Sequence, residues 1–290
     1  MEAGRFEKVK LFLYMLPLIA FYAVMFVTPI VLIFLQSIGL YSLGHMGETK
    51  FTLEYYKKFF ELGGTYLHAL WFSTWNSGLA ALIIGVLSYL LALFFHFMEF
   101  KGKRIVTAIY KIPLFIPYLI SAFAWWNLLT PGGYVQRFLA WIGVIDEMTQ
   151  LVNDKYGIGI IIANVWINLP YMVILLVGAL KMIDPSIIEA SRVLGAGFWK
   201  TVKNVIFPLT IPSFIAGSLL VFIGMFGAFS VPFILGGSWP KYMSITIYED
   251  VVDRGEWGIG SVQAVIYMIS ALLIAYFYTK VMRRMRGERA

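Results

Sequence analysis

The sequence predicts an all-α integral membrane protein with six transmembrane helices, and its composition and charge distribution carry this prediction. Hydrophobic residues make up 60% of the 290 residues, charged residues only 13%, and the mean hydropathy is +0.79. A chain of this composition is too apolar to be a soluble domain. Six stretches lack Asp, Glu, Lys and Arg, and each exceeds the roughly 20 residues that cross a hydrocarbon core of about 30 Å. They are residues 11–47, 62–98, 112–136, 156–180, 204–240 and 257–279.

The six spans are expected to form a single transmembrane domain over residues 1–290. The first span follows Arg5, Lys8 and Lys10 as the apolar core of a signal sequence does, but its run is far longer than the roughly 7 to 15 residues of a cleaved segment. We therefore expect it to remain in the protein. The expected spans are residues 11–38, 66–97, 105–129, 157–181, 206–232 and 259–281, with a polar loop at 182–205.

Basic residues predict the orientation of these spans. With the amino terminus inside, the inner segments hold fifteen Lys and Arg residues, whereas the outer loops hold seven, together with ten acidic residues. Because positive charge accumulates on the cytoplasmic side, both termini and the 182–205 loop are predicted to be cytoplasmic. Short segments beside anionic membrane lipid then explain the net charge of +7, and no nucleic acid is expected as a partner.

Several kinds of chemistry have no candidate residues in this sequence. It contains no cysteine, which excludes disulfides and thiolate metal sites. His45, His68 and His96 are too widely spaced to share a helix turn, so no metal site is expected. The pattern G-x-x-x-x-G-K-[ST], which cradles nucleotide phosphates, is absent as well. We expect neither a catalytic residue nor a cofactor on this chain, and hence no enzyme within the membrane.

The loop at 182–205 carries the signals of one short helix. Asp184 suits the N-cap, and Pro185 suits the first helical position because its missing N–H would be unpaired there. Gly195 suits the left-handed residue that ends a helix. The roughly ten residues between them extend only about 15 Å, which is too short to cross a membrane.

Side chains on this short helix divide between two faces. Ile187, Ser191 and Leu194 recur at helical spacing and are expected to form an apolar ridge. Glu189 and Arg192 lie three residues apart on another face and are expected to form a charge pair. Such a helix either lies on lipid head groups or docks into a groove of a soluble partner. The residue pattern alone leaves both interpretations open.

A longer pattern around this helix separates the two interpretations. It resembles the EAA loop of the membrane-spanning subunits of binding-protein-dependent ABC importers, in which Glu-Ala-Ala precedes a Gly, an aliphatic residue, Leu and Pro. The matching positions are Glu189, Ala190, Gly195, Val205 and Pro208, and the mild departures are Ser191 and Phe207. The resemblance extends over residues 68–281 and favours docking on a partner.

This resemblance implies a type I ABC importer permease, forming half of a translocation pathway in the inner or plasma membrane of a prokaryote. The implied partners are a second permease subunit or a copy of this chain, two cytoplasmic ATP-binding subunits that hold ATP and Mg, and an extracytoplasmic substrate-binding protein. The short helix would couple the ATPases to the membrane helices. The implied coupling residues are Glu189, Ala190, Ser191, Arg192, Leu194 and Gly195.

The later part of the pattern indicates a substrate class. Residues 194–237 look most like the branch that imports polyamines, ferric ion and related small charged solutes. A small charged organic solute such as a polyamine is therefore expected, with a sugar, ferric ion or a phosphonate as alternatives. A self-sufficient secondary transporter or channel is a more remote alternative, because the six charge-free stretches hold no Asp, Glu, Lys or Arg for ion coupling.

Polar side chains within the spans are the candidates for the pathway. An amide or hydroxyl in hydrocarbon needs a partner, which a substrate or a neighbouring helix provides. Asn164 and Asn168 share one helix face, and Ser230 lies in the proline-bent outer half of the fifth span. Hydrogen bonding between helices is the alternative role for each asparagine. The pathway candidates are Asn127, Asn164, Asn168, Phe229 and Ser230.

Overall fold

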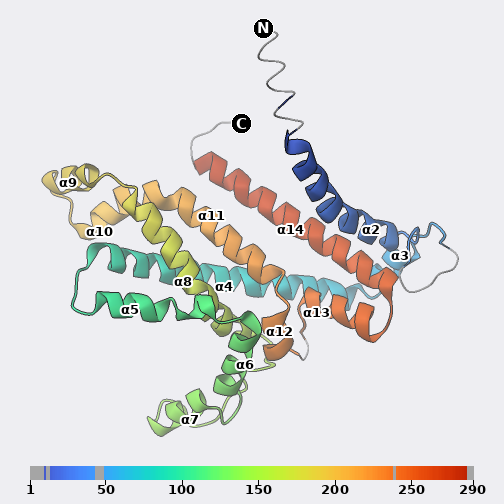
Figure 1. Ribbon diagram of the computed structural model, residues 1–290. Helices are drawn as coiled ribbons and strands as arrows, with labels where there is room; N and C mark the ends of the chain where they lie inside the picture. The colour runs from blue at the N-terminus through green and yellow to red at the C-terminus, as the bar shows by residue number, and fades with distance from the viewer. Residues whose placement is uncertain (1–9, 11–13, 43–48, 238–239, 286–290) are drawn as a thin grey trace. The chain divides into compact units, whose positions relative to one another are not determined.

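The computed structural model describes residue 10 and residues 14–42, 49–237 and 240–285, the side chains of residues 284 and 285 excepted. Regular structure in this part of the chain is helical throughout, without strands (Figure 1). Contacts divide the chain into two compact units. The smaller comprises Met1–Tyr66 with Thr246–Ile269, and the larger Leu67–Ile245 with Ser270–Ala290.

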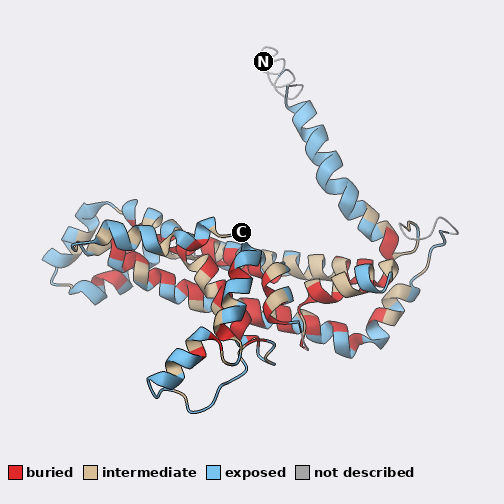
Figure 2. Ribbon diagram, turned by 60° about the horizontal axis from the view of Figure 1, so that its bottom comes forward, coloured by how far each residue is buried: buried red, intermediate tan, exposed pale blue. Residues whose placement is uncertain are grey.

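Five helices among the described residues are long and apolar enough to cross a membrane, and a bent pair of helices provides a sixth segment. These segments confirm the predicted all-α membrane fold. The first of these helices, Tyr14–Ser37, is almost entirely exposed (Figure 2), and its most apolar stretch holds no buried residue. The five helices are Tyr14–Ser37, Gly63–Phe97, Ile158–Lys181, Phe198–Phe226 and Trp257–Arg283.

The third segment, expected as one helix over residues 105–129, is broken in the structure. α5 (Lys103–Tyr110) leads through a short 3-10 helix, η2 (Ile112–Phe115), to α6 (Tyr118–Leu129). The two halves of the segment are bent by 107°. Ile116 at the break is extended, with φ −98° and ψ 123°, and it precedes Pro117. A proline disfavours the helical conformation of the residue before it, so the chain turns here.

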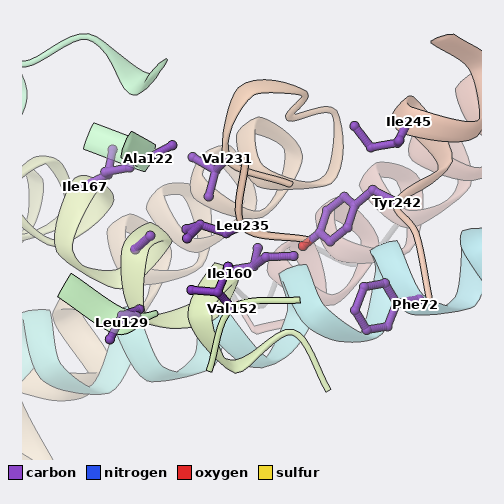
Figure 3. Close-up of a cluster of buried hydrophobic side chains, with 11 residues drawn as sticks. Phe72, Ala122, Leu129, Val152, Ile160, Ile167, Val231, Leu235, Tyr242 and Ile245 are labelled. Carbon is purple, nitrogen blue, oxygen red and sulfur yellow. The ribbon is translucent and has the colours of Figure 1, made fainter. Parts of the chain in front are cut away.

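Three helices form the packed centre of the larger unit: α8 (Ile158–Lys181), α11 (Phe207–Phe226) and α12 (Ser230–Leu235). At Gly217 a Cβ would lie 2.6 Å from Met172 Sδ, so α11 approaches α8 closely through a residue without a side chain. Figure 3 shows a buried cluster in which Leu235 of α12 and Ile160 of α8 lie near Tyr242. In lipid, such close packing holds helices together in place of the hydrophobic effect.

A polar clamp joins α4 (Gly63–Phe97) to the start of α8. The buried amide of Asn76 donates to the carbonyl oxygens of Tyr156 at 3.0 Å and Gly157 at 3.2 Å. Its Oδ1 accepts a hydrogen bond from the Tyr242 hydroxyl at 2.7 Å. Gly157 is the N-cap of α8 and has φ +69°, a conformation that favours glycine. Asn76 therefore has the interhelical role that its position in a span allows.

A buried carboxylate organises the smaller unit. Asp250 lies in a π-helix, η4 (Glu249–Asp253), is 1% exposed, and accepts hydrogen bonds from Arg254 and Gln263. Tyr66 also bonds to this carboxylate. Thr246 bonds the Gln263 Oε1 in turn, at 2.9 Å. Arg254 and Gln263 thus pair both side-chain oxygens of Asp250, as buried polar groups require.

The remaining elements connect or extend those described above. Those in the first part of the chain are η1 (Ala23–Val27), α2 (Thr28–Ser37), α3 (Glu54–Glu61) and α7 (Tyr134–Trp141). Those in the second part are α9 (Pro185–Val193), α10 (Phe198–Thr201), η3 (Val202–Ile206), α13 (Met243–Tyr248) and α14 (Trp257–Met285).

Candidate functional site

The 182–205 loop forms the short helix that the sequence predicts. α9 begins at Pro185, and the Asp184 carboxylate accepts a hydrogen bond from the Ser186 backbone N–H at 2.9 Å. This hydrogen bond lowers the pKa of Asp184 below its ordinary value. The cap stays ionised at neutral pH, where its negative charge also suits the positive end of the helix dipole.

The carboxyl end of α9 is closed by a left-handed glycine, also as predicted. Gly195 has φ +79°, and its N–H donates to the Arg192 carbonyl at 2.9 Å. The Ala196 N–H reaches back to the Ser191 carbonyl at 3.1 Å. A Cβ built on Gly195 would meet no described atom within 4 Å. Within the described chain, the preference for glycine therefore comes from the backbone conformation.

The apolar surface of α9 is left uncovered by the rest of the described chain. The helix contains no buried residue, and both Val193 and Leu194 are 87% exposed. Ser191 faces the other way, because its hydroxyl lies 2.9 Å from that of Thr201. The predicted ridge of Ile187, Ser191 and Leu194 is thus divided. Leu194 lies in the exposed apolar tip, and Ser191 attaches the helix to α10.

Glu189 and Arg192 do not form the expected charge pair. Both are exposed, and the structure gives no ion pair between them. Exposed pairs at this spacing contribute only a few tenths of a kcal/mol, which solvation of the separate side chains readily offsets. Ala190 between them is exposed as well, so the whole tip of the loop is open.

α9 is connected mechanically to two membrane helices. The Thr201 that bonds Ser191 is buried, and α10 and η3 then run directly into α11. Phe198 of α10 makes an edge contact with Phe97, at the end of α4, with ring centroids 5.7 Å apart. Further along, the Tyr89 and Thr210 hydroxyls lie 3.0 Å apart and join α4 to α11. These contacts link α9, through α10, to both α4 and α11.

The pathway candidates occupy different environments. Asn168 lines a cavity of about 290 Å³ between η2, α6, α8 and α11, together with Tyr118 and Tyr171. The Asn168 Oδ1 lies 3.4 Å from the Tyr118 hydroxyl, and its Nδ2 donates to the Asn164 carbonyl at 2.9 Å. The two tyrosines were not predicted from the sequence, since interfacial tyrosines are common at such positions.

The other candidates do not line this cavity. Asn164 is 1% exposed, and neither polar atom of its side chain has a hydrogen-bond partner among the described residues. Asn127 donates to the Phe123 carbonyl of its own helix at 2.8 Å. Ser230 begins α12, a separate helix after α11, and Phe229 before it stacks on Phe233 with ring centroids 5.0 Å apart. The structure therefore brings Asn164 and Asn168 together but leaves Asn127 elsewhere.

No metal centre emerges from the side chains that the structure describes, which contain no cluster of three or more potential His, Asp or Glu ligands. The larger unit therefore has two candidate functional sites, the cavity beside Asn168 and the exposed α9 tip. One lies among apolar helices, and the other projects at the end of α8 and α11 with α10 (Figure 1).

Comparison with known proteins agrees with this architecture. Residues 84–287 match the family described as the binding-protein-dependent transport system inner membrane component. The spermidine/putrescine transport system permease protein PotB of Escherichia coli is 30% identical over 233 residues, covering 80% of this chain and 83% of the relative. A probable sulfate transport system permease protein, cysT of Prototheca wickerhamii, is 27% identical over 199 residues, covering 68% and 75%.

A solved structure extends the likeness along the chain. A bacterial ABC transporter involved in the import of the acidic polysaccharide alginate aligns with a TM-score of 0.81 at 21% identity, covering 98% of this chain and 99% of that chain. A bacterial alginate ABC transporter in complex with an alginate pentasaccharide-bound periplasmic protein also aligns with a TM-score of 0.81 at 21% identity, covering 98% of each chain. Sequence, helical fold and the loop helix agree, and this chain belongs to the inner membrane components of binding-protein-dependent transport systems, the permease subunits of ABC importers.

Proposed function

We propose that this permease forms half of the pathway of an ATP-driven importer for polyamines. The observation that carries the coupling role is α9, which is capped at both ends, has no buried residue, and is attached through Ser191 and Thr201 to α10 and α11. A helix so ordered and so uncovered is suited to a groove on another protein. In this role Glu189, Ala190, Arg192, Leu194 and Gly195 contact the ATPase, and Ser191 transmits its movement.

The substrate assignment combines the PotB likeness with the chemistry of the cavity. None of the residues that line the cavity is charged. Tyrosine ring faces and the Asn168 amide oxygen attract an organic cation. A sulfate or a carboxylated sugar would need basic or many donor groups, which this lining lacks. The unpaired Asn164 amide, one helical turn from Asn168, provides a further polar group along the same face.

The proposed assembly rests on membership of the family. We infer a second permease subunit or a second copy of this chain, two ATP-binding subunits that hold ATP and Mg on the cytoplasmic side, and an extracytoplasmic binding protein that delivers the solute. Both termini and α9 are then cytoplasmic, as the distribution of basic residues predicts. Closure of the ATPases would move α9, and the Phe97, Phe198 and Thr201 contacts would pass the movement to α4 and α11.

Transport by the reconstituted importer tests the substrate. With both permeases, the ATPases and the binding protein in proteoliposomes, we expect ATP-dependent uptake of labelled spermidine that unlabelled putrescine reduces and sulfate does not. Uptake of sulfate or of an oligosaccharide, without uptake of spermidine, would contradict the polyamine assignment and leave the permease role in place. Loss of all ATP-dependent uptake by an assembled complex would contradict both.

Substitutions in the pathway test the cavity. Asn168→Leu removes the amide from the cavity and is expected to reduce spermidine uptake about tenfold, the effect of losing about 1.4 kcal/mol in a desolvated polar contact. Asn127→Leu serves as the matched control, because among the described residues the Asn127 side chain bonds to Phe123 of its own helix. Ser230→Trp tests the α12 side, where impaired uptake would support a pathway role. Unchanged uptake in a normally expressed Ser230→Trp protein would remove Ser230 and Phe229 from the pathway.

A further inference from the structure

A basic turn, defined as residues 98–111, joins α4 to η2 and includes α5. It contains Lys101, Lys103, Arg104 and Lys111 against a single acidic residue, Glu99, and so carries a formal charge of +3 from four bases less one acid. The turn shares no residue with α9 or with the lining of the cavity beside Asn168. Neither proposed role therefore accounts for its charge.

Ion pairing inside the basic turn uses up its only carboxylate. The Lys103 Nζ lies 2.7 Å from Glu99 Oε1 and also donates to the Met98 carbonyl at 2.9 Å. Lys101 and Arg104 are both exposed, and neither has an acidic partner among the described residues. Both cations are thus available to bind an anionic group from outside the described chain.

An apolar stripe begins directly beside these cations. Ile105, Ile109 and Ile112 follow one another at spacings of four and three residues and are 66%, 58% and 49% exposed. The opposite side of the helix is the packed one, since Tyr110 stacks on Phe95 of α4 with ring centroids 4.9 Å apart. Ile105 and Ile109 belong to α5, and Ile112 begins η2, so the stripe crosses the junction of the two helices. It belongs to a segment apolar enough to cross a membrane.

An open cavity lies at the charged end of the stripe. It has a volume of about 730 Å³ and is bounded by Gly102, Lys103, Arg104, Ile105 and Thr107, together with Glu99 and Phe100. Gly102 has φ +92° and is the N-cap of α5, so the backbone turns sharply where the basic side chains gather. Three of the four basic residues lie at this end, and the exposed aliphatic residues follow them along the chain. Lys111 lies at the other end, with its Nζ 5.8 Å from the centroid of the Tyr110 ring.

We propose that the basic turn is a binding site for an anionic phospholipid. Arg104, which lines the cavity, and the exposed Lys101 beside Gly102 bind the head-group phosphate. An acyl chain lies along Ile105, Ile109 and Ile112. Cationic residues at the membrane surface attract anionic lipids, and the aliphatic stripe matches a hydrocarbon chain, which makes no polar demands. A docked protein helix is a poorer match, because it would have to satisfy the two cations and the isoleucines with separate residues.

Lipid retention by the assembled importer tests this proposal. The importer is placed in phosphatidylcholine nanodiscs that also contain the probe lipid, dioleoyl-phosphatidylglycerol. Native mass spectrometry then measures how much of this lipid stays bound to the importer after release from the nanodiscs. K101Q/R104Q is expected to weaken binding of this lipid about 30-fold, since each basic residue near an anionic surface contributes about fivefold. The charge-preserving K101R/R104K should retain it, as should K50Q/K155Q, which removes two cations from other loops. Equal retention by K101Q/R104Q and wild type would overturn the proposal.

A second measurement identifies what covers the isoleucine stripe, and the chain is suited to it because it contains no native cysteine. With a spin label on Ile109→Cys, lipid-soluble oxygen should enhance the relaxation of the label, whereas a water-soluble nickel chelate should not. Crosslinking of Ile109→Cys to another subunit, with protection from oxygen, would show a protein occupant and overturn the proposal. Thermal unfolding of each variant confirms that its fold is retained, and the charge-preserving variant provides the folded reference if K101Q/R104Q is poorly expressed.

Discussion

α8 and α9 follow one another in the chain but are held in place by different means. Of the residues in the most apolar stretch of α8, 56% are buried, whereas α9 has no buried residue. α8 also contains Pro170 in its interior and remains a helix because α11, α12 and α6 pack around it. α9 depends on Asp184 and Gly195 at its two ends. One helix is thus stabilised by its neighbours, and the other is formed locally and left available.

The largest expected effect is the loss of transport when the exposed end of α9 is changed. Glu189→Lys and Gly195→Asp should each abolish transport while membrane abundance stays normal, because both residues are exposed and no described atom lies near a Cβ at Gly195. Reversing a charge at a desolvated contact costs several kcal/mol of binding, and a Cβ at a left-handed residue adds about 1 kcal/mol or more. The measurement is spermidine uptake together with co-purification of the ATPase.

A matched glycine controls for the backbone strain in this experiment. Gly143 also has a positive φ, +73°, and open space around its missing Cβ. Gly143→Asp should therefore carry similar strain but retain uptake. Wild-type uptake and ATPase association in both α9 variants would show that α9 is a surface helix only.

The second prediction concerns the packing of α8. Gly217→Leu on α11 places a side chain where Met172 and Leu175 already lie, at 2.6 and 3.2 Å from the Cβ position. Overpacking of this kind costs about 1 to 3 kcal/mol. Gly178→Leu, on α8 itself, meets no atom within 4 Å of its Cβ and serves as the control. Thermal unfolding in detergent should show a lowered midpoint for Gly217→Leu alone, and equal midpoints would contradict the close α8 to α11 approach.

The third prediction tests the clamp at the amino end of α8. Asn76→Ala removes the hydrogen bonds to the Tyr156 and Gly157 carbonyls and leaves the Tyr242 hydroxyl with the longer contact to Ser77, at 3.5 Å. Polar contacts between membrane helices contribute about 0.6 to 2 kcal/mol, so a moderate loss of stability is expected. Asn127→Ala should change stability less, because that side chain is exposed and bonds within its own helix. A greater loss for Asn127→Ala would reverse the structural roles assigned to the two asparagines.

The smallest expected effect is the pH dependence of the α9 cap. The pKa of Asp184 is lowered in the folded state by the Ser186 N–H, so its contribution is fully present above the ordinary value of 3.8 and is lost as the pH falls through the lowered value. Hydrogen exchange, corrected for the intrinsic rate at each pH, should show α9 fraying in acid. Asp184→Asn keeps a capping oxygen without a charge and should remove this dependence. An identical acid response in Asp184→Asn would assign it to another group.

Several features were predictable because they depend on neighbours in the sequence. Asp184 caps the residue two positions away, and Gly195 ends the helix that it follows, so both were predicted and both are confirmed. The apolar stretches likewise depend only on composition and length. The prediction of a charge pair between Glu189 and Arg192 was wrong, because their spacing permits such a contact but solvent competes with it.

The sequence by itself determined the membrane class, the capped helix and the family pattern around Glu189, Gly195 and Pro208. All three depend on residues that are close to one another in the sequence. Only the tertiary structure decided which polar groups meet. Asn76 and Asn168 look alike in sequence, yet one is clamped by Tyr242 and the other lines a cavity. Likewise Tyr66, Asp250 and Gln263 form one buried network from distant parts of the chain. Such partners are chosen by how helices approach one another, and that approach depends on packing along their whole length.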